Sequence, residues 1–101
     1  MAGQYHEPHE QLSRKTKELH RACVSLIEEI EAMDGYQQRI DATRDHALKK
    51  ILEQNRDEEK EHACMLLEWI RRNDEGLAKS MKIYVSLEEP EFIDPYSILR
   101  K

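Results

Sequence analysis

The sequence predicts an all-α protein, in which two long helices form an antiparallel hairpin and a short third helix follows. Only three Gly and three Pro interrupt the 101 residues, and charged residues make up 37% against 39% hydrophobic residues. This composition is typical of long helices with solvated outer faces. In addition, apolar residues recur at alternating spacings of four and three, a pattern of helices that pack nearly parallel or antiparallel.

The chain is expected to form one small domain, because its mass of 12.0 kDa is near the lower end of what buries a self-sufficient core. We place the helical domain at residues 10–88, between a flexible N-terminal segment, 1–9, and a non-helical tail, 89–101. A hairpin of two helices has one buried interface and exposes the flank of each apolar stripe. We therefore expect two copies to dimerise into a four-helix bundle.

The first long helix is expected from about Glu10 to Arg39, a stretch that holds no Pro and a single glycine, Gly35. Cys23 in this stretch is interpreted as a small core residue. The predicted apolar stripe consists of Leu12, Thr16, Leu19, Cys23, Leu26, Ile30, Met33, Gln37 and Ile40.

The second long helix follows the break at residues 41–45, where Thr43 or Asp45 can cap its first turn with a side-chain oxygen. Arg71 and Arg72 suit its C-terminal end, because cations are favourable at the negative end of the helix dipole. Its predicted stripe consists of Leu48, Leu52, Asn55, Glu59, His62, Leu66 and Trp69. After a turn at residues 73–76, a shorter helix is expected from about Gly76 to Leu87.

Net charge, hydropathy and cysteine usage exclude several classes of function. The net charge is −5 and the basic residues are interleaved with acidic ones, so nucleic acid is a poor candidate partner. No apolar run approaches the ~20 residues of a membrane span. The two cysteines, Cys23 and Cys64, lack the spacing of a disulfide framework or a CxxC motif, which indicates a reducing cytoplasm.

Two residues of the second stripe, Glu59 and His62, are ionisable where core residues are expected. Their spacing of three puts both on one side of the helix, and Glu-x-x-His is a ligand pair that iron, manganese or zinc accepts. A carboxylate-bridged di-iron bundle takes two such motifs and two further Glu. Glu29 is the best-placed candidate on the first helix, because it shares a face with Ala22, Leu26 and Met33. One chain would then carry half of a dinuclear site, which two-fold pairing completes.

Plainer interpretations stay open for these residues. Glu59 and His62 can be an ordinary solvated pair, and Glu28 and Glu31 can be an acidic outer face. Tyr36 can be an interface aromatic with a solvated hydroxyl. The chain as a whole is also compatible with a helical-hairpin interaction module, or with a metal-binding dimer that catalyses no oxidation.

The segments SLIEEIEAMDGYQQRIDA and NRDEEKEHACMLLEWIRRND, with HEP near the N-terminus, resemble the encapsulated ferritin family over about residues 6–88. The resemblance implies a ferritin-like four-helix bundle rebuilt by dimerisation, and dimers assembled into a ring-shaped decamer. It further implies a ferroxidase that oxidises Fe(II) to Fe(III) at a di-iron centre and works inside an encapsulin shell, which stores the iron. Glu29, Glu59 and His62 match the family's iron ligands, and Tyr36 lies beside them.

The same resemblance assigns Glu28 and Glu31 to an outer acidic metal site. Gly35 departs from the family pattern, which usually has Trp at this position. The end of the tail, residues 96–101, is similar to a short encapsulin-targeting peptide because it combines aliphatic and basic residues.

Overall fold

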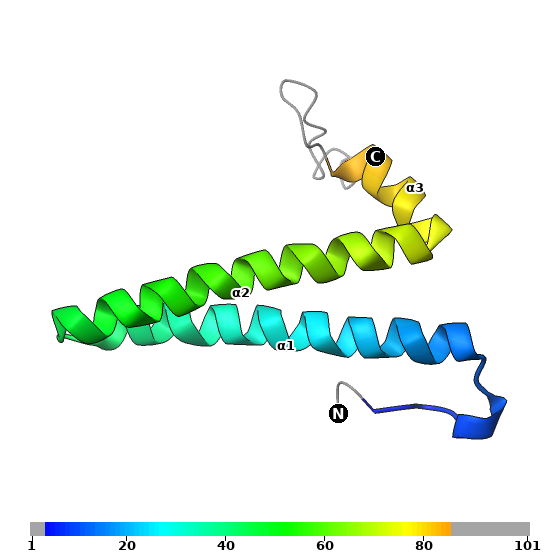
Figure 1. The fold of residues 1–101 in the computed structure, drawn as a ribbon, viewed down its shortest axis with the longest axis horizontal. Coiled ribbons are helices and arrows are strands. Elements are labelled where there is room, and N and C mark those ends of the chain that lie inside the picture. Colours follow the sequence, from blue (N-terminus) through cyan, green and yellow to red (C-terminus); the bar gives the residue numbers. More distant parts are fainter. Residues whose placement is uncertain (1–3, 86–101) are drawn as a thin grey trace, which may run out of the picture.

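The computed structural model of the chain describes residues 4–85. These residues form a short 3-10 helix, η1 (His9–Gln11), and three α-helices, α1 (Arg14–Ala42), α2 (His46–Asn73) and α3 (Glu75–Tyr84). α1 and α2 lie side by side and antiparallel, and α3 turns away from α2 on the side remote from α1 (Figure 1). The prediction of a helical hairpin with a short third helix is therefore confirmed, whereas the predicted tail at 89–101 lies outside the described residues.

α1 begins at Arg14, four residues later than predicted, because Ser13 caps it. The Ser13 hydroxyl accepts a hydrogen bond from the Thr16 backbone N–H at 3.1 Å, which satisfies one of the unpaired donors of the first turn. Leu12 is extended and separates η1 from α1. The N-terminal segment folds back along α1, where the Tyr5 ring stacks on His20 at a centroid distance of 4.0 Å (Figure 1).

Aspartates cap the other two helices. Asp45 Oδ1 accepts from the Leu48 backbone N–H at 3.0 Å, so of the two predicted caps Asp45 is the one used at α2. Asp74 caps α3 in the same way through the Leu77 N–H. α3 ends at Tyr84, before the predicted Leu87, because the backbone of Val85 is already extended.

The described part of the chain has a small interior. Its buried apolar residues, exposed by 4–9%, are Ala22, Ile40, Leu52 and Ile70. They occupy corresponding levels of α1 and α2, so the hairpin is held by a single line of contact between the two helices. A chain of this size with so little burial has limited stability of its own.

Only part of the apolar stripe predicted for the first helix is buried in the structure. Cys23 was expected in the core but is exposed, and Ile30 is 47% exposed. The face of α1 that meets α2 instead carries Ala22, Leu26, Glu29, Met33, Tyr36 and Ile40, which are buried or half-buried. The reason is that α1 has apolar residues on two adjoining faces, and the periodicity of the sequence cannot tell which of them meets the second helix.

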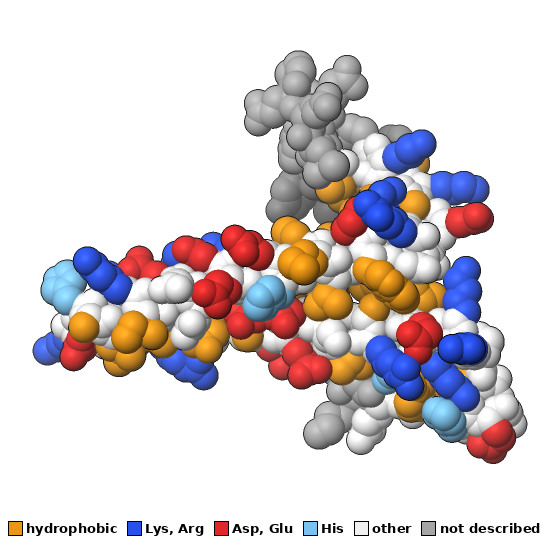
Figure 2. Space-filling view, in the orientation of Figure 1, with side chains coloured by type: hydrophobic (Ala, Val, Ile, Leu, Met, Phe, Trp, Pro, Cys, Tyr) orange, Lys and Arg blue, Asp and Glu red, His pale blue; other side chains and the backbone are white. Residues whose placement is uncertain are grey.

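Large apolar side chains are exposed along one side of each long helix, and patches of them run over the face of the hairpin in Figure 2. We call these residues the exposed apolar rows. They are Ile27 and Ile30 of α1 together with Leu48, Ile51, Met65 and Trp69 of α2, which are 38–68% exposed.

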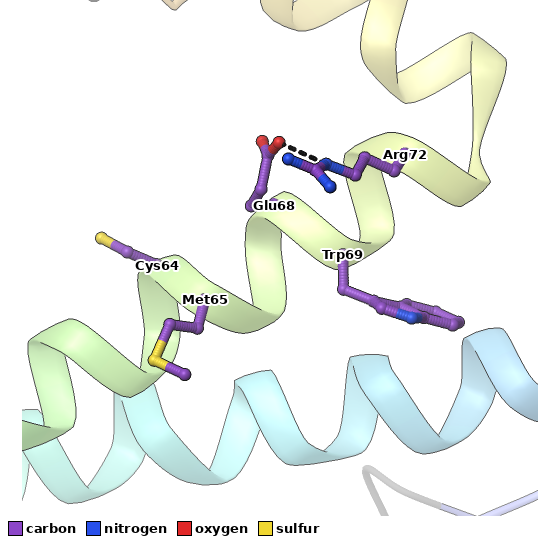
Figure 3. Close-up of a pocket in the computed structure, with 5 residues that line it drawn as sticks. All are labelled: Cys64, Met65, Glu68, Trp69 and Arg72. Carbon is purple, nitrogen blue, oxygen red and sulfur yellow. Dashed lines mark hydrogen bonds and ion pairs between the residues drawn. The ribbon is translucent and has the colours of Figure 1, made fainter.

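At the end of the α2 row, an open hollow of about 480 Å³ is lined by Cys64, Met65, Glu68, Trp69 and Arg72. Figure 3 shows Met65 and Trp69 pointing to the α1 side of α2, with Cys64 and Glu68 on the other side. Both exposed apolar rows and this hollow leave apolar surface for a further element to cover. Among the described residues, no helix combines the length and apolar character that a membrane crossing requires.

Candidate metal centre

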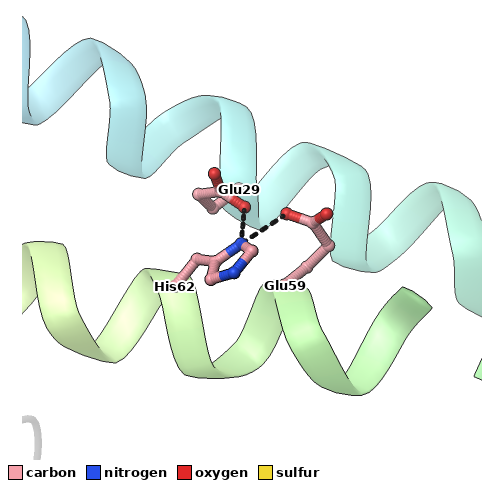
Figure 4. A group of neighbouring side chains, drawn as sticks. All are labelled: Glu29, Glu59 and His62. Carbon is pink, nitrogen blue, oxygen red and sulfur yellow. Dashed lines mark ion pairs between the residues drawn. The ribbon is translucent and has the colours of Figure 1, made fainter. Parts of the chain in front are cut away.

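Three of the predicted ligands converge midway along the hairpin. Glu29 reaches over from α1, and Glu59 and His62 reach from successive turns of α2 (Figure 4). Each offers one ligand atom, and these atoms all lie within 4.8 Å of one another. The spacing of three between Glu59 and His62 brings them to one side of α2, as expected for a helix.

The distances in this cluster are longer than those of good hydrogen bonds and slightly longer than those between two ligands of one ion. His62 Nδ1 lies 3.5 Å from Glu29 Oε2 and 3.7 Å from Glu59 Oε2. Both separations are too long for a good hydrogen bond. Two donors that bind one ion at about 2.1 Å each, at angles of a tetrahedron or octahedron, lie about 3.0–3.4 Å apart. Small side-chain adjustments would therefore let the three groups share an ion.

The strongest local indication is an unsatisfied atom. Glu29 Oε2 is buried and has no hydrogen-bond partner among the described residues. A carboxylate oxygen withdrawn from water without a partner costs free energy, which a cation would offset. Two carboxylates and one imidazole suit iron, manganese or zinc. The exposed fractions of the side chains, 24% for Glu29, 22% for Glu59 and 49% for His62, leave the cluster open on one side.

The remaining predicted site residues lie apart from this cluster. Glu28 and Glu31 are exposed on the outer side of α1. Tyr36 is half-buried two turns beyond Glu29, about 10 Å along the helix axis. Its ring contacts the Arg39 guanidinium, whose central carbon is 5.3 Å from the ring centroid. Within one chain, Tyr36 is therefore a neighbour of Arg39 and not of the three converging side chains.

Gly35 sits inside α1 next to this pair. A Cβ at this position would meet only the Arg39 guanidinium, at 3.8–3.9 Å, which is ordinary van der Waals contact. The Arg39 side chain thus extends back along the helix over Gly35, in the direction that helical side chains favour. A Cβ at position 35 would be compatible with this conformation of Arg39.

Two arginine interactions were not anticipated from the sequence. Arg56 is half-buried and donates a hydrogen bond to Gln37 of α1. In the sequence, the one indication of a role for Arg56 was its spacing of three from Glu59. Near the end of α2, hydrogen bonds from Arg71 and Arg72 lower the pKa of Glu68 from 4.5 to about 2. Arg71 contributes most, because it donates from Nε and from a terminal nitrogen to the two carboxylate oxygens at 2.6 and 2.7 Å.

The two long helices pack as a hairpin of the kind found in ferritin-like folds, and they bring two carboxylates and an imidazole together. Comparison with known proteins agrees with this class. The chain belongs to the EncFtn-like family, whose model matches residues 4–88.

Individual relatives are closely similar. A "Ferritin-like protein" of Thermotoga maritima is 51% identical over 90 residues, which are 89% of this chain and 79% of the relative. An "Encapsulated ferritin-like protein" of Rhodospirillum rubrum is 54% identical over 85 residues, 84% of this chain, and the match spans 61% of that protein's length. A crystal structure of a protein from Nitrosomonas europaea is 54% identical, has a TM-score of 0.79, and covers 86% of this chain and 96% of its own.

Proposed function

We propose that this chain is a ferroxidase subunit, and that two copies form a di-iron centre from two sets of Glu29, Glu59 and His62. The observation that carries the proposal is the convergence of these three side chains around a buried oxygen of Glu29 that has no hydrogen-bond partner among the described residues. Membership of the EncFtn-like family supports it. Iron is the substrate, entering as Fe(II) and leaving as Fe(III).

Two chains are proposed to pair because the metal site of one chain is incomplete. Three side chains cannot hold two ions with bridging carboxylates, whereas two copies supply four carboxylates and two imidazoles. His62 is 49% exposed and lies on the same side of α2 as Met65 and Trp69 of the exposed apolar rows. A second chain that covers these rows would therefore also close the open side of the metal cluster.

The reaction balances as a two-electron transfer. Each of two Fe(II) ions loses one electron, and dioxygen takes both with two protons to give hydrogen peroxide; hydrogen peroxide as oxidant would give water. Carboxylate oxygens stabilise the higher charge of Fe(III), because they are hard anionic ligands held in place by the helices. Tyr36 would lie beside the paired site, and Glu28 and Glu31 would attract Fe(II) along the outer face of α1.

We further propose that dimers assemble into a ring-shaped decamer that works as cargo inside an encapsulin compartment of the cytoplasm. The name of the Rhodospirillum rubrum relative, an encapsulated ferritin-like protein, supports this location. The tail at residues 96–101 would bind the shell. Oxidised iron would then be stored in the shell, since a hairpin has no cage of its own.

Stopped-flow absorbance in the near ultraviolet, where Fe(III)–oxygen species absorb, tests the activity after Fe(II) is mixed with the aerobic protein. Glu29→Ala and His62→Ala should lower the initial rate by at least tenfold, because each removes one ligand from both ions. Glu61→Ala is the matched control, since Glu61 is an exposed carboxylate of the same helix outside the cluster. Variants that oxidise iron as fast as the unaltered protein would refute the assignment.

Metal content and oligomeric state separate the alternatives. Native mass spectrometry with and without Fe(II) should show two irons per dimer. A dimer that binds metal without oxidising it would be a non-catalytic metal-binding protein. A chain that binds no metal would be a helical interaction module.

A further inference from the structure

A chain of hydrogen bonds links α2 to α1 on the side of the metal cluster that faces the hairpin turn. Arg56 donates from a terminal nitrogen to Gln37 Oε1 at 3.0 Å and from Nε to Asp57 Oδ1 at 3.0 Å. Gln37 Nε2 in turn donates to Asp41 Oδ1 at 3.1 Å. The guanidinium is thus held by one partner on its own helix and by one on the facing helix.

Arg56 lies where it can influence the metal cluster. It precedes Glu59 by one helical turn, about 4.5 Å along the axis. Its side chain is only 19% exposed, and its guanidinium makes directed bonds to both helices. Nearer the turn, the helices are held by the buried pair Ile40 and Leu52.

The cluster needs a fixed alignment of the two helices, because Glu29 is its sole member from α1. A slide of α1 along α2 by one residue moves Glu29 by about 1.5 Å. That is a large fraction of its 3.5 Å separation from His62. Apolar packing is non-directional and tolerates small slides, whereas a guanidinium bonded on two sides resists them.

We propose that Arg56, acting through Gln37, is a positioning residue that sets Glu29 against Glu59 and His62 for metal binding. The inference rests on the proposed metal site. It adds an interhelical contact, outside the ligand set, that sets the geometry in which the ion is held.

Cobalt(II) is a suitable probe, because the intensity of its visible absorption bands reports coordination geometry as well as occupancy. The variants are Arg56→Met and Gln37→Met, which keep an unbranched side chain but remove its hydrogen-bonding group, and the double variant. Arg21→Met is the control, an arginine of α1 that is 73% exposed and pairs with Glu18 of the same helix. Each single variant should weaken cobalt(II) binding by about tenfold, as loss of outer partners does in other metal sites, and should alter the band intensity at saturation. The double variant should bind cobalt(II) no more weakly than either single variant, because each single substitution already removes the Arg56–Gln37 hydrogen bond.

Circular dichroism and native mass spectrometry at the same protein concentration supply the structural readout. Unchanged cobalt(II) affinity and band intensity in Arg56→Met would overturn the inference. Weakened cobalt(II) binding that accompanies a loss of helix or of dimer, with an unchanged spectrum at saturation, would also overturn it. Additive losses of affinity in the double variant would do the same. If the unaltered protein binds no cobalt(II), the proposed metal site itself fails, and the inference fails with it.

Discussion

Glu29→Gln should stabilise the metal-free protein and destabilise the metal-loaded one. Without metal, the native protein keeps a carboxylate oxygen of Glu29 buried without a hydrogen-bond partner among the described residues. The substitution preserves shape, removes the charge and supplies an amide donor that can reach the Glu59 carboxylate or His62. With metal, the same substitution removes an anionic ligand, so the order of stabilities should reverse.

The magnitude follows from the burial of the group. An unsatisfied buried polar group costs about 1–3 kcal/mol, and the 24% exposure of the Glu29 side chain argues for the lower end. A gain of about 1 kcal/mol per chain corresponds to a melting temperature about 4–8 °C higher for a domain of this size. At a metal concentration of about 100 times Kd, the native site gains about 2.7 kcal/mol, most of which the variant forfeits.

Thermal unfolding followed by circular dichroism measures both effects, first with a chelator and then with manganese(II), at one fixed protein concentration. Glu61→Gln is the control, because this exposed carboxylate outside the cluster should change stability by less than about 0.5 kcal/mol under either condition. The reasoning would be refuted by a Glu29→Gln variant that melts below the native protein in chelator. It would also be refuted if manganese(II) raised the melting temperature of the variant as much as that of the native protein.

Three further outcomes concern stability and are measured by chemical or thermal unfolding. Ile70→Ala should cost about 2–4 kcal/mol, because Ile70 is 4% exposed and its removal leaves a cavity between the long helices. Asp45→Ala should cost about 1 kcal/mol, since it removes the side-chain acceptor that caps α2. The contribution of Glu68 should depend on pH. Because Arg71 and Arg72 lower the pKa of Glu68 from 4.5 to about 2, the native state binds fewer protons than the unfolded state between these values. The stability due to this group is present above pH 4.5 and is lost as the pH falls toward 2.

A matched comparison tests each of the three stability predictions. An Ile70→Ala variant no less stable than a variant of the exposed Ile51 would show that the line of contact between the helices contributes little. Retention of full α2 stability in Asp45→Ala would mean that another group caps the helix. The stability difference between the native protein and Glu68→Gln should shrink between pH 5 and pH 2.5, and a constant difference would contradict the assigned pKa.

Much of the hairpin could be predicted because its ends and spacing are local properties of the sequence. Asp45 was a predicted cap because an oxygen-bearing side chain precedes an apolar pattern, and the structure confirms it. Glu29, Glu59 and His62 could be singled out because helical spacing fixes which side chains share a face, and the structure brings them together. Their role as iron ligands stays a prediction.

Other features depend on contacts between helices, which spacing alone does not specify. Cys23 and Ile30 belong to an apolar row that the single chain leaves exposed, so their periodicity resembled that of core residues. Arg56 looked like any solvated charge until Gln37 was placed opposite it on the facing helix.

Gly35 makes this part of α1 a favourable position for engineering and for evolutionary change. The Cβ of a new side chain there would make ordinary van der Waals contact with the flexible Arg39 guanidinium. Replacing glycine within a helix also gains up to about 1 kcal/mol of helix propensity. A small side chain could therefore be installed beside Tyr36 with little cost to folding, and this one codon could diversify the outer surface while the scaffold stays intact.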